Sequence, residues 1–226
     1  MSTRVSEAAA PEPVPLPGAG PEPLPELTLG NPKLAPRLST TGDTQRWLLS
    51  YYRTSEISGA LFFGRLARAQ PPGEIQQDLT RHFADEAQHA RYWTDCIAEL
   101  GGHPLRLNGA YQDQYLAAAG MPANLMEVLA ITSVFERRVV NQYARHLALP
   151  ELEPAIARTL TKIMEDERWH IFWVREALHE LEKDYGHDHV VATVRRFQQA
   201  DREVYYATID EHEERLAFLH KRSGHS

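Results

Sequence analysis

Two copies of one short pattern carry residue types that bind transition metals. An acid, a glutamate, two other residues and a histidine occur at Asp85–His89 and again at Asp166–His170. On an α-helix, side chains three residues apart lie on the same face, so the glutamate and the histidine of each copy can reach one metal ion. Each copy therefore predicts half of a metal site.

Two further glutamates repeat with the same spacing. Glu56 lies 30 residues before Glu86, and Glu136 lies 31 residues before Glu167, so the chain reads as a doubled helix pair. Four glutamates and two histidines that project inward from four helices form the ligand set of a binuclear carboxylate centre. The predicted metal ligands, which are also the predicted catalytic residues, are Glu56, Glu86, His89, Glu136, Glu167 and His170.

Two divalent ions would neutralise these four carboxylates in a core that penalises either set of charges alone. Ligation rich in carboxylate, with one imidazole per ion, suits iron or manganese better than copper or structural zinc. We expect two iron ions, with manganese or a mixed Fe/Mn pair as the alternative. The expected partners are Glu56 with His89 and Glu136 with His170, bridged by Glu86 and Glu167.

Three other residues are predicted to support the ligands. A metal-bound histidine usually donates its second ring N–H to a carboxylate, and Asp85 and Asp166 can each accept this bond from the histidine of the other copy. The alternative is that both are ordinary surface acids. Tyr52, one turn before Glu56, is either a proton or electron relay or a core aromatic residue.

Four long helices must position these residues. Asp43 or Thr44 can cap the first helix, Pro122 and Pro154 can occupy the first turns of the third and fourth, and Gly186 can end the fourth. The predicted ranges are about 43–70, 73–100, 122–149 and 154–185. The key glutamate lies near the midpoint of every helix, so antiparallel packing brings all four to one level.

Each key glutamate also lies on an apolar helix face. The face around Glu86 carries Leu79, Phe83, Ala90, Trp93 and Ile97. A charge buried there without a partner is costly, which favours a metal site over a solvated surface. Small neighbours such as Gly59 and Ala90 leave room for a substrate or allow tight helix packing. The other histidines, His82, His103, His146 and His179, are interpreted as surface or packing residues, with His82 as the first candidate for an exception.

The rest of the chain divides by composition. Residues 1–40 are a proline-rich tail predicted to be disordered, which serves as a solubilising leader or as a docking strap. Residues 41–186 form the predicted bundle, in which the connection 101–121 is long enough to cross between helices two and three. Residues 187–220 predict a fifth helix that covers the bundle or mediates homodimerisation, and residues 221–226 should fray.

Composition narrows the class of protein. A length of 226 residues suits one domain, and a net charge of −7 without a basic run disfavours nucleic acid and anionic membranes as partners. The single Cys96 fits a reducing compartment and excludes an internal disulfide. No secretory signal and no membrane-spanning apolar run is recognised. We therefore expect a cytoplasmic protein.

The six predicted ligands, in this order over residues 43–185, resemble the ferritin-like superfamily of di-iron carboxylate proteins, which includes bacterioferritins, rubrerythrins and di-iron oxygenases. The resemblance implies an all-α fold: a ferritin-like antiparallel four-helix bundle with a long crossover and, here, an additional C-terminal helix. The chain departs from rubrerythrins in lacking their cysteine cluster and in having Val139 where they carry a further glutamate. It departs from the monooxygenases at Gln88, Trp169 and Val140.

The resemblance implies three alternative functions. The first is an oxidoreductase in which di-iron activates dioxygen to oxidise or hydroxylate a small organic substrate. Because no flavin or nicotinamide motif is found, its electrons would come from a separate donor or from the substrate. The second is a ferroxidase that handles iron. The third is a non-enzymatic scaffold that uses its tail and fifth helix for binding.

Overall fold

The computed structural model describes residues 41–107, 115–116, 119–208 and 214–219. Every regular element in these ranges is a helix, which confirms the predicted all-α class. The predicted tails 1–40 and 221–226 lie outside these ranges, as do parts of the 101–121 connection and of the fifth helix. The long helices are α1 (Thr41–Ala69), α2 (Glu74–Glu99), α4 (Leu125–Leu147), α5 (Pro154–Tyr185) and α6 (His187–Thr208).

Local capping explains where the helices begin and end. Pro154 occupies the first turn of α5, and Gly186 follows its last turn with a φ of 82°, a conformation that glycine adopts without strain. The predicted start of α4 at Pro122 is wrong. The Asn124 side chain accepts a hydrogen bond from the Glu127 backbone N–H at 3.0 Å, while the Glu127 carboxylate accepts one from Ala123 N–H, so the helix begins at Leu125.

The other boundaries differ less from the prediction. α1 begins at Thr41, so Asp43 and Thr44 lie within its first turn rather than before it. α4 ends at Leu147, two residues before the expected end, because Ala148 closes its last turn. The described residues after α6 include a further helical segment at 214–219.

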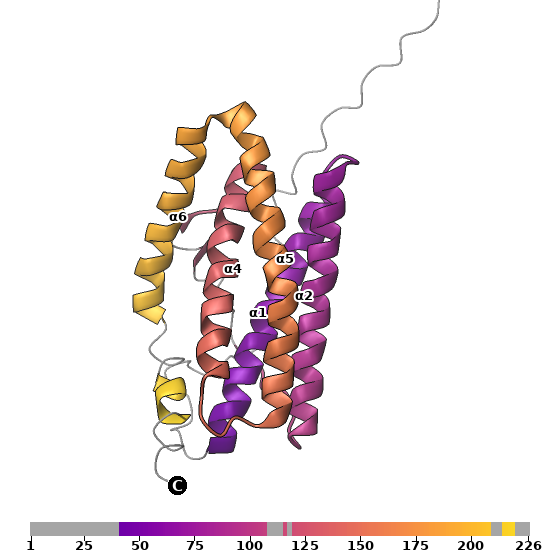
Figure 1. Ribbon diagram of the computed structural model, residues 1–226, viewed down its shortest axis with the longest axis vertical. Helices are drawn as coiled ribbons and strands as arrows, with labels where there is room; N and C mark the ends of the chain where they lie inside the picture. The colour runs from indigo at the N-terminus through magenta and orange to yellow at the C-terminus, as the bar shows by residue number, and fades with distance from the viewer. Residues whose placement is uncertain (1–40, 108–114, 117–118, 209–213, 220–226) are drawn as a thin grey trace, which may run out of the picture.

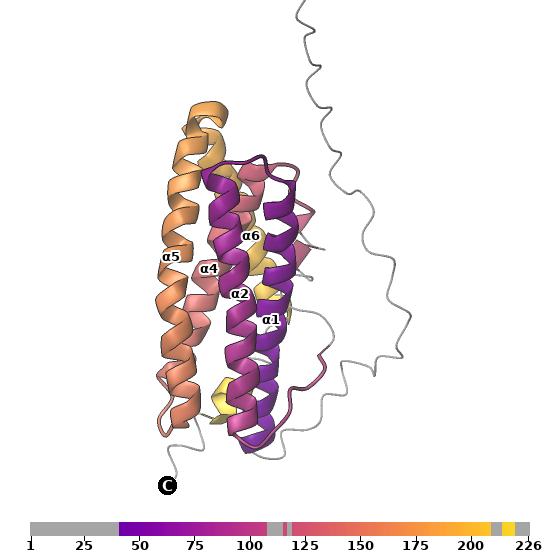
Figure 2. The same ribbon diagram turned by 90° about the vertical axis from the view of Figure 1, so that its right-hand side faces the viewer.

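The helices lie side by side as long rods (Figures 1 and 2). α1 packs against α2, α4 packs against α5, and α2 and α5 join the two pairs. α6 covers the side formed by α4 and α5, which is one of the two roles predicted for it. Two contacts attach α6: a partly buried ion pair between Arg138 of α4 and Asp201 of α6, and a hydrogen bond from the Tyr115 hydroxyl to the Phe197 carbonyl.

Two apolar clusters fill the core between these helices. One contains Leu79, Met126, Leu129 and Val174, and the other contains Leu49, Trp93, Tyr143 and Leu160. Each large side chain buried in this way contributes about 1.5–3 kcal/mol to stability. On α1, α2, α4 and α5 alike, the key glutamate lies between a residue of one cluster and a residue of the other. Both clusters therefore flank the level at which the glutamates converge.

One residue of the predicted apolar faces lies elsewhere. Phe83 is 38% exposed, although its spacing from Glu86 predicted a core position. Its ring lies over Gly64 of α1, where the lack of a side chain lets it rest at the edge of the α1–α2 interface. No helix in the described ranges is both long and apolar enough to cross a bilayer.

Candidate metal centre

The six predicted ligands converge in the middle of the helices, and a seventh residue joins them. All seven are at most 6% exposed. They are Glu56 on α1, His82, Glu86 and His89 on α2, Glu136 on α4, and Glu167 and His170 on α5. Sequence reasoning grouped His82 with the surface or packing residues but named it as the first candidate for an exception, and its place in the cluster makes it that exception.

The donor atoms fall into two overlapping groups, each within 4.8 Å of one another. One group is His82, Glu86, Glu136 and His170, and the other is Glu56, Glu86, His89 and Glu167. Glu86 belongs to both. Glu167 also faces both sides, because its Oε1 lies 3.5 Å from His89 Nδ1 and its Oε2 lies 3.1 Å from His170 Nδ1. The two glutamates predicted to bridge thus occupy the centre of the cluster.

Each single glutamate lies beside the histidine predicted to share its ion. Glu56 Oε2 is 3.7 Å from His89 Nδ1, and Glu136 Oε2 is 3.7 Å from His170 Nδ1. In both histidines the Nδ1 atom faces the carboxylates. Any ion held here would therefore bind imidazole through Nδ1.

The opposite ring nitrogens face the two aspartates in the predicted crossed arrangement. His89 Nε2 of α2 lies 3.2 Å from Asp166 Oδ2 of α5, and His170 Nε2 of α5 lies 3.4 Å from Asp85 Oδ2 of α2. A carboxylate can only accept, so each Nε2 carries the proton and donates it. A metal requires the lone pair of Nδ1, so an ion that binds either ring would displace any proton from that atom while Nε2 keeps its own. The role of these aspartates in metal binding stays a prediction.

Two buried atoms show that the donor set suits a cation. His89 Nδ1 and Glu167 Oε1 have no hydrogen-bond partner among the described residues, although they lie only 3.5 Å apart. Buried polar atoms are normally paired. A divalent ion between such atoms satisfies both, and carboxylate oxygen with imidazole nitrogen is a ligand set that iron and manganese accept.

The electrostatics of the cluster reflect an excess of acids. Burial raises the pKa of Glu86 well above its ordinary value, and the charges of Glu56 and Glu136 raise it further. Burial, with the charge of Glu136, raises the pKa of Glu167 to about 8. Burial lowers the pKa of His89, but the close approach and the negative charge of Glu56 outweigh this and bring the pKa to about 9. Cations that replace these protons would relieve the same excess of negative charge.

Glu56 is held by aromatic residues that hydrogen-bond to it. The Tyr143 hydroxyl donates to Glu56 Oε1, and Trp93 Nε1 lies 3.4 Å from the same oxygen and 3.3 Å from the Tyr143 hydroxyl. Tyr52 packs its ring edge-on against Tyr143, with centroids 4.9 Å apart. Tyr52 was predicted as a supporting residue, and the hydrogen bonds described at Glu56 come from Tyr143 and Trp93.

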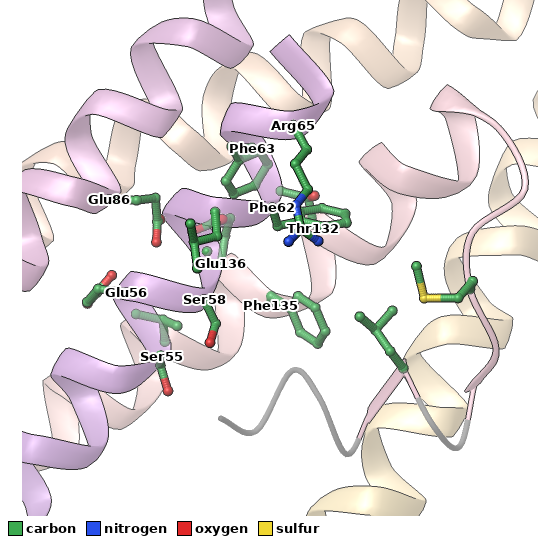
Figure 3. A pocket seen from close by; sticks show the side chains of 15 residues that line it. Ser55, Glu56, Ser58, Phe62, Phe63, Arg65, Glu86, Thr132, Phe135 and Glu136 are labelled. Carbon is green, nitrogen blue, oxygen red and sulfur yellow. The ribbon is translucent and has the colours of Figure 1, made fainter. Parts of the chain in front are cut away.

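A cavity of about 370 Å³ opens directly beside the cluster, between α1 and α4. Figure 3 shows the carboxylates of Glu56, Glu86 and Glu136 on one side of it and Phe135 on another. Gly59 also lines it, and a Cβ built there would lie 2.3 Å from Glu86 Oε2. The two roles considered for this glycine were room for a substrate and tight helix packing; the structure adds a third, because the missing side chain leaves space for the Glu86 carboxylate.

The other histidines within the described ranges do not join the cluster. His179 is exposed and lies 3.3 Å from Glu182, while His146 is buried against the Tyr52 ring. His82 had a detectable signal in the sequence, because residues 82, 86 and 89 follow the spacing of one helix face.

The described chain is thus a helical protein with a buried histidine and glutamate cluster that could hold metal. No protein-family model matches the chain, and a search of curated proteins finds no significant match.

Proposed function

We propose that the protein is a ferritin-like di-iron carboxylate oxidoreductase that uses dioxygen to oxidise or hydroxylate a small organic substrate. The observation that carries this proposal is the cavity, because it gives an organic molecule direct access to three carboxylates of a buried binuclear donor set. A site that only stored or oxidised iron has no need of an apolar chamber of this size.

The helix order supports the ferritin-like assignment. α2 and α4 both pass from the cluster of Leu79 and Met126 to the cluster of Trp93 and Tyr143, so they point the same way. The end of α2 and the start of α4 therefore lie at opposite ends of the bundle, which is the relation that the long crossover of a ferritin-like topology connects. α1 and α2, and likewise α4 and α5, are antiparallel neighbours joined by short turns.

Iron bound here would supply the redox chemistry that no side chain of the chain provides. The protein's own groups do the rest. The Asp85 and Asp166 carboxylates keep the two histidine rings in the metal-binding tautomer. Tyr143 and Trp93 hold one oxygen of Glu56 and leave the other toward the centre. The two apolar clusters exclude water from both ends, which strengthens electrostatic interactions inside.

The lining of the cavity indicates the class of substrate. Most of its surface comes from apolar side chains, among them Phe62, Phe135, Leu116 and Val139. Arg65 is the only cationic side chain in this lining, and no ion pair to it is formed by the described residues. We infer that the substrate has an apolar body and an anionic group such as a carboxylate. The cavity volume of about 370 Å³ lies near the small end of the range for ligand pockets, so the substrate must be small.

Metal loading followed by oxygen exposure tests the function. Protein loaded anaerobically with Fe(II) is expected to bind two ions per chain and, with a chemical reductant and oxygen, to oxidise apolar carboxylates from a compound library, as detected by mass spectrometry. Repeated oxidation of free Fe(II) with mineral formation and no organic product would favour the ferroxidase instead. Failure to bind iron or manganese would favour the scaffold.

Variants of the predicted ligands test the assignment, and variants of exposed residues serve as matched controls. Glu86→Ala and His170→Ala are expected to lose stoichiometric binding of two ions, measured by elemental analysis after desalting. His179→Ala and Glu176→Ala remove the same side chains from exposed positions of α5 and should bind two ions like the unaltered protein. Two tightly bound ions in Glu86→Ala or His170→Ala would contradict the ligand assignment.

A further inference from the structure

His82 is the one histidine of the cluster that the predicted ligand set leaves without a role. Its ring is completely buried, and its Nε2 lies 3.2 Å from Glu86 Oε1 and 3.2 Å from Glu136 Oε1. By distance alone, His82 could serve as a third imidazole ligand. Which of its ring nitrogens donates and which accepts a hydrogen bond indicates a different role.

The deciding contact is on the other side of the ring. Trp173 Nε1 lies 3.2 Å from His82 Nδ1. An indole N–H can only donate, so Nδ1 must accept and cannot carry a proton. A neutral imidazole has one proton, which therefore lies on Nε2, the atom that faces Glu86 and Glu136. The lone pair that a metal would need at Nε2 is absent from this tautomer.

The same test gives the opposite result for the two predicted histidine ligands. The outer nitrogens of His89 and His170 face the acceptors Asp166 and Asp85, so each ring keeps a proton on its outer nitrogen when a metal takes the inner one. The outer nitrogen of His82 faces a donor, so its inner nitrogen has a proton. The hydrogen-bond partner of the outer nitrogen thus divides the three histidines of the cluster into two kinds: His89 and His170 face an acceptor, and His82 faces a donor.

We propose that His82 is a positioning residue and not a metal ligand: Trp173 fixes its tautomer, and its Nε2–H is shared between Glu86 and Glu136. This inference rests on the proposed metal site. The bond ties a central carboxylate of α2 to the single glutamate of α4, two helices that belong to different antiparallel pairs. Each ion then keeps one imidazole, which agrees with the ligand set that suits iron and manganese.

The surroundings of the ring oppose any rearrangement into a ligand. His82 is stacked between the ring of Phe63, at 3.8 Å between centroids, and the ring of His170, at 3.7 Å. A half-turn of the ring would place carbon atoms against Trp173 N–H and against both carboxylates. Moving the proton to Nδ1 would set two donors against each other. Either change leaves buried polar groups without partners.

Nitrogen NMR of the full-length protein tests the proposal directly. Two-bond ¹H–¹⁵N correlation spectra report which ring nitrogen of a histidine is protonated, and diamagnetic Zn(II) serves as the metal probe. In both the metal-free and the zinc-loaded protein, His82 is expected to keep its proton on Nε2. The Nδ1 signals of His89 and His170 are expected to shift on loading. Loss of the His82 Nε2 proton with a coordination shift on that atom would overturn the proposal.

Three variants separate positioning from ligation by a second readout. His82→Ala is expected to bind two Co(II) ions with affinity lowered about 10–100-fold, as is typical when a residue that holds a ligand is removed. His82→Gln, whose amide can donate in place of the ring, should recover part of this loss. X-ray absorption should count one imidazole per cobalt before and after the change. A fall in that count, or in stoichiometry from two to one, would overturn the proposal.

Trp173→Phe completes the test. Without the indole donor, the Nε2–H tautomer should no longer be the only one that the His82 spectrum shows. If Trp173→Phe leaves that spectrum unchanged, the indole does not fix the tautomer and the proposal is wrong. Absence of zinc and cobalt binding in the unaltered protein would refute the metal site instead, while the metal-free spectrum would still decide whether His82 is held as proposed.

Discussion

Gly59→Ala should separate metal binding from folding. The added Cβ would lie 2.3 Å from Glu86 Oε2 and 3.0 Å from its Cδ, whereas an ordinary contact is about 3.5 Å. The carboxylate must therefore move by about 1 Å. Its oxygens are the far end of a flexible side chain, so the helices need not separate. A glycine within α1 also destabilises it by about 1 kcal/mol relative to alanine.

These two effects have opposite signs, and two assays measure them. The free energy of unfolding of the metal-free variant, from denaturant titration, should be unchanged or higher by up to about 1 kcal/mol. The dissociation constant for Fe(II) or Co(II), from anaerobic calorimetry, should rise at least ~10-fold, because Glu86 belongs to both donor groups and loss of a group that only supports a ligand already weakens binding that much.

Gly64→Ala is the matched control on the same helix. Its Cβ would meet the Phe83 ring at 3.2 Å, and this partly exposed ring can shift without touching the cluster. Metal affinity should therefore stay unchanged. Equal affinities in Gly59→Ala and the unaltered protein would refute the reasoning, because Glu86 would then not be held as a ligand at the position that the structure shows.

Three further changes test the electrostatics. The melting temperature of the metal-free protein, measured by fluorimetry, should fall as pH rises from about 5 to about 9. The pKa of Glu167 in the folded protein, about 8, lies above its ordinary 4.5, so the stability that this group contributes is complete below pH 4.5 and is lost as pH rises through 8. Bound metal should abolish this trend. Asp85→Asn should weaken metal binding about 10–100-fold in calorimetry, whereas the exposed Asp95→Asn should not. Asp201→Ala removes the partly buried ion pair with Arg138 and should lower the free energy of unfolding by ~2 kcal/mol in urea titration, with metal stoichiometry unchanged as the check on specificity.

The gathering of the six ligands could be predicted because helix geometry alone determines it. A glutamate and a histidine three residues apart on a helix share a face whatever the rest of the chain does. The equal spacing of Glu56 and Glu136 from the two Asp-Glu-x-x-His copies then placed all four acids at one level, and the structure brings them together. The crossed contacts of Asp85 and Asp166 follow from the same symmetry.

The features that escaped prediction depend on contacts between helices. Whether His82 binds metal depends on Trp173, which lies 91 residues away in the sequence and approaches only after α2 and α5 pack. Pro122 has the backbone geometry of a helix start, yet the side chain of Asn124 offered a better cap. Phe83 shares the apolar spacing of its helix, but the space opposite it on α1 is occupied by a glycine.

The crossed aspartate and histidine contacts also set the register of α2 against α5. Asp85 bonds to His170 while Asp166 bonds to His89, so each helix gives one donor and one acceptor to the other. Sliding either helix by one turn, about 5.4 Å, would break both contacts together. These two contacts therefore align the two antiparallel pairs along their axes without a metal ion. An ion that binds would meet ligands whose heights along the bundle are already fixed.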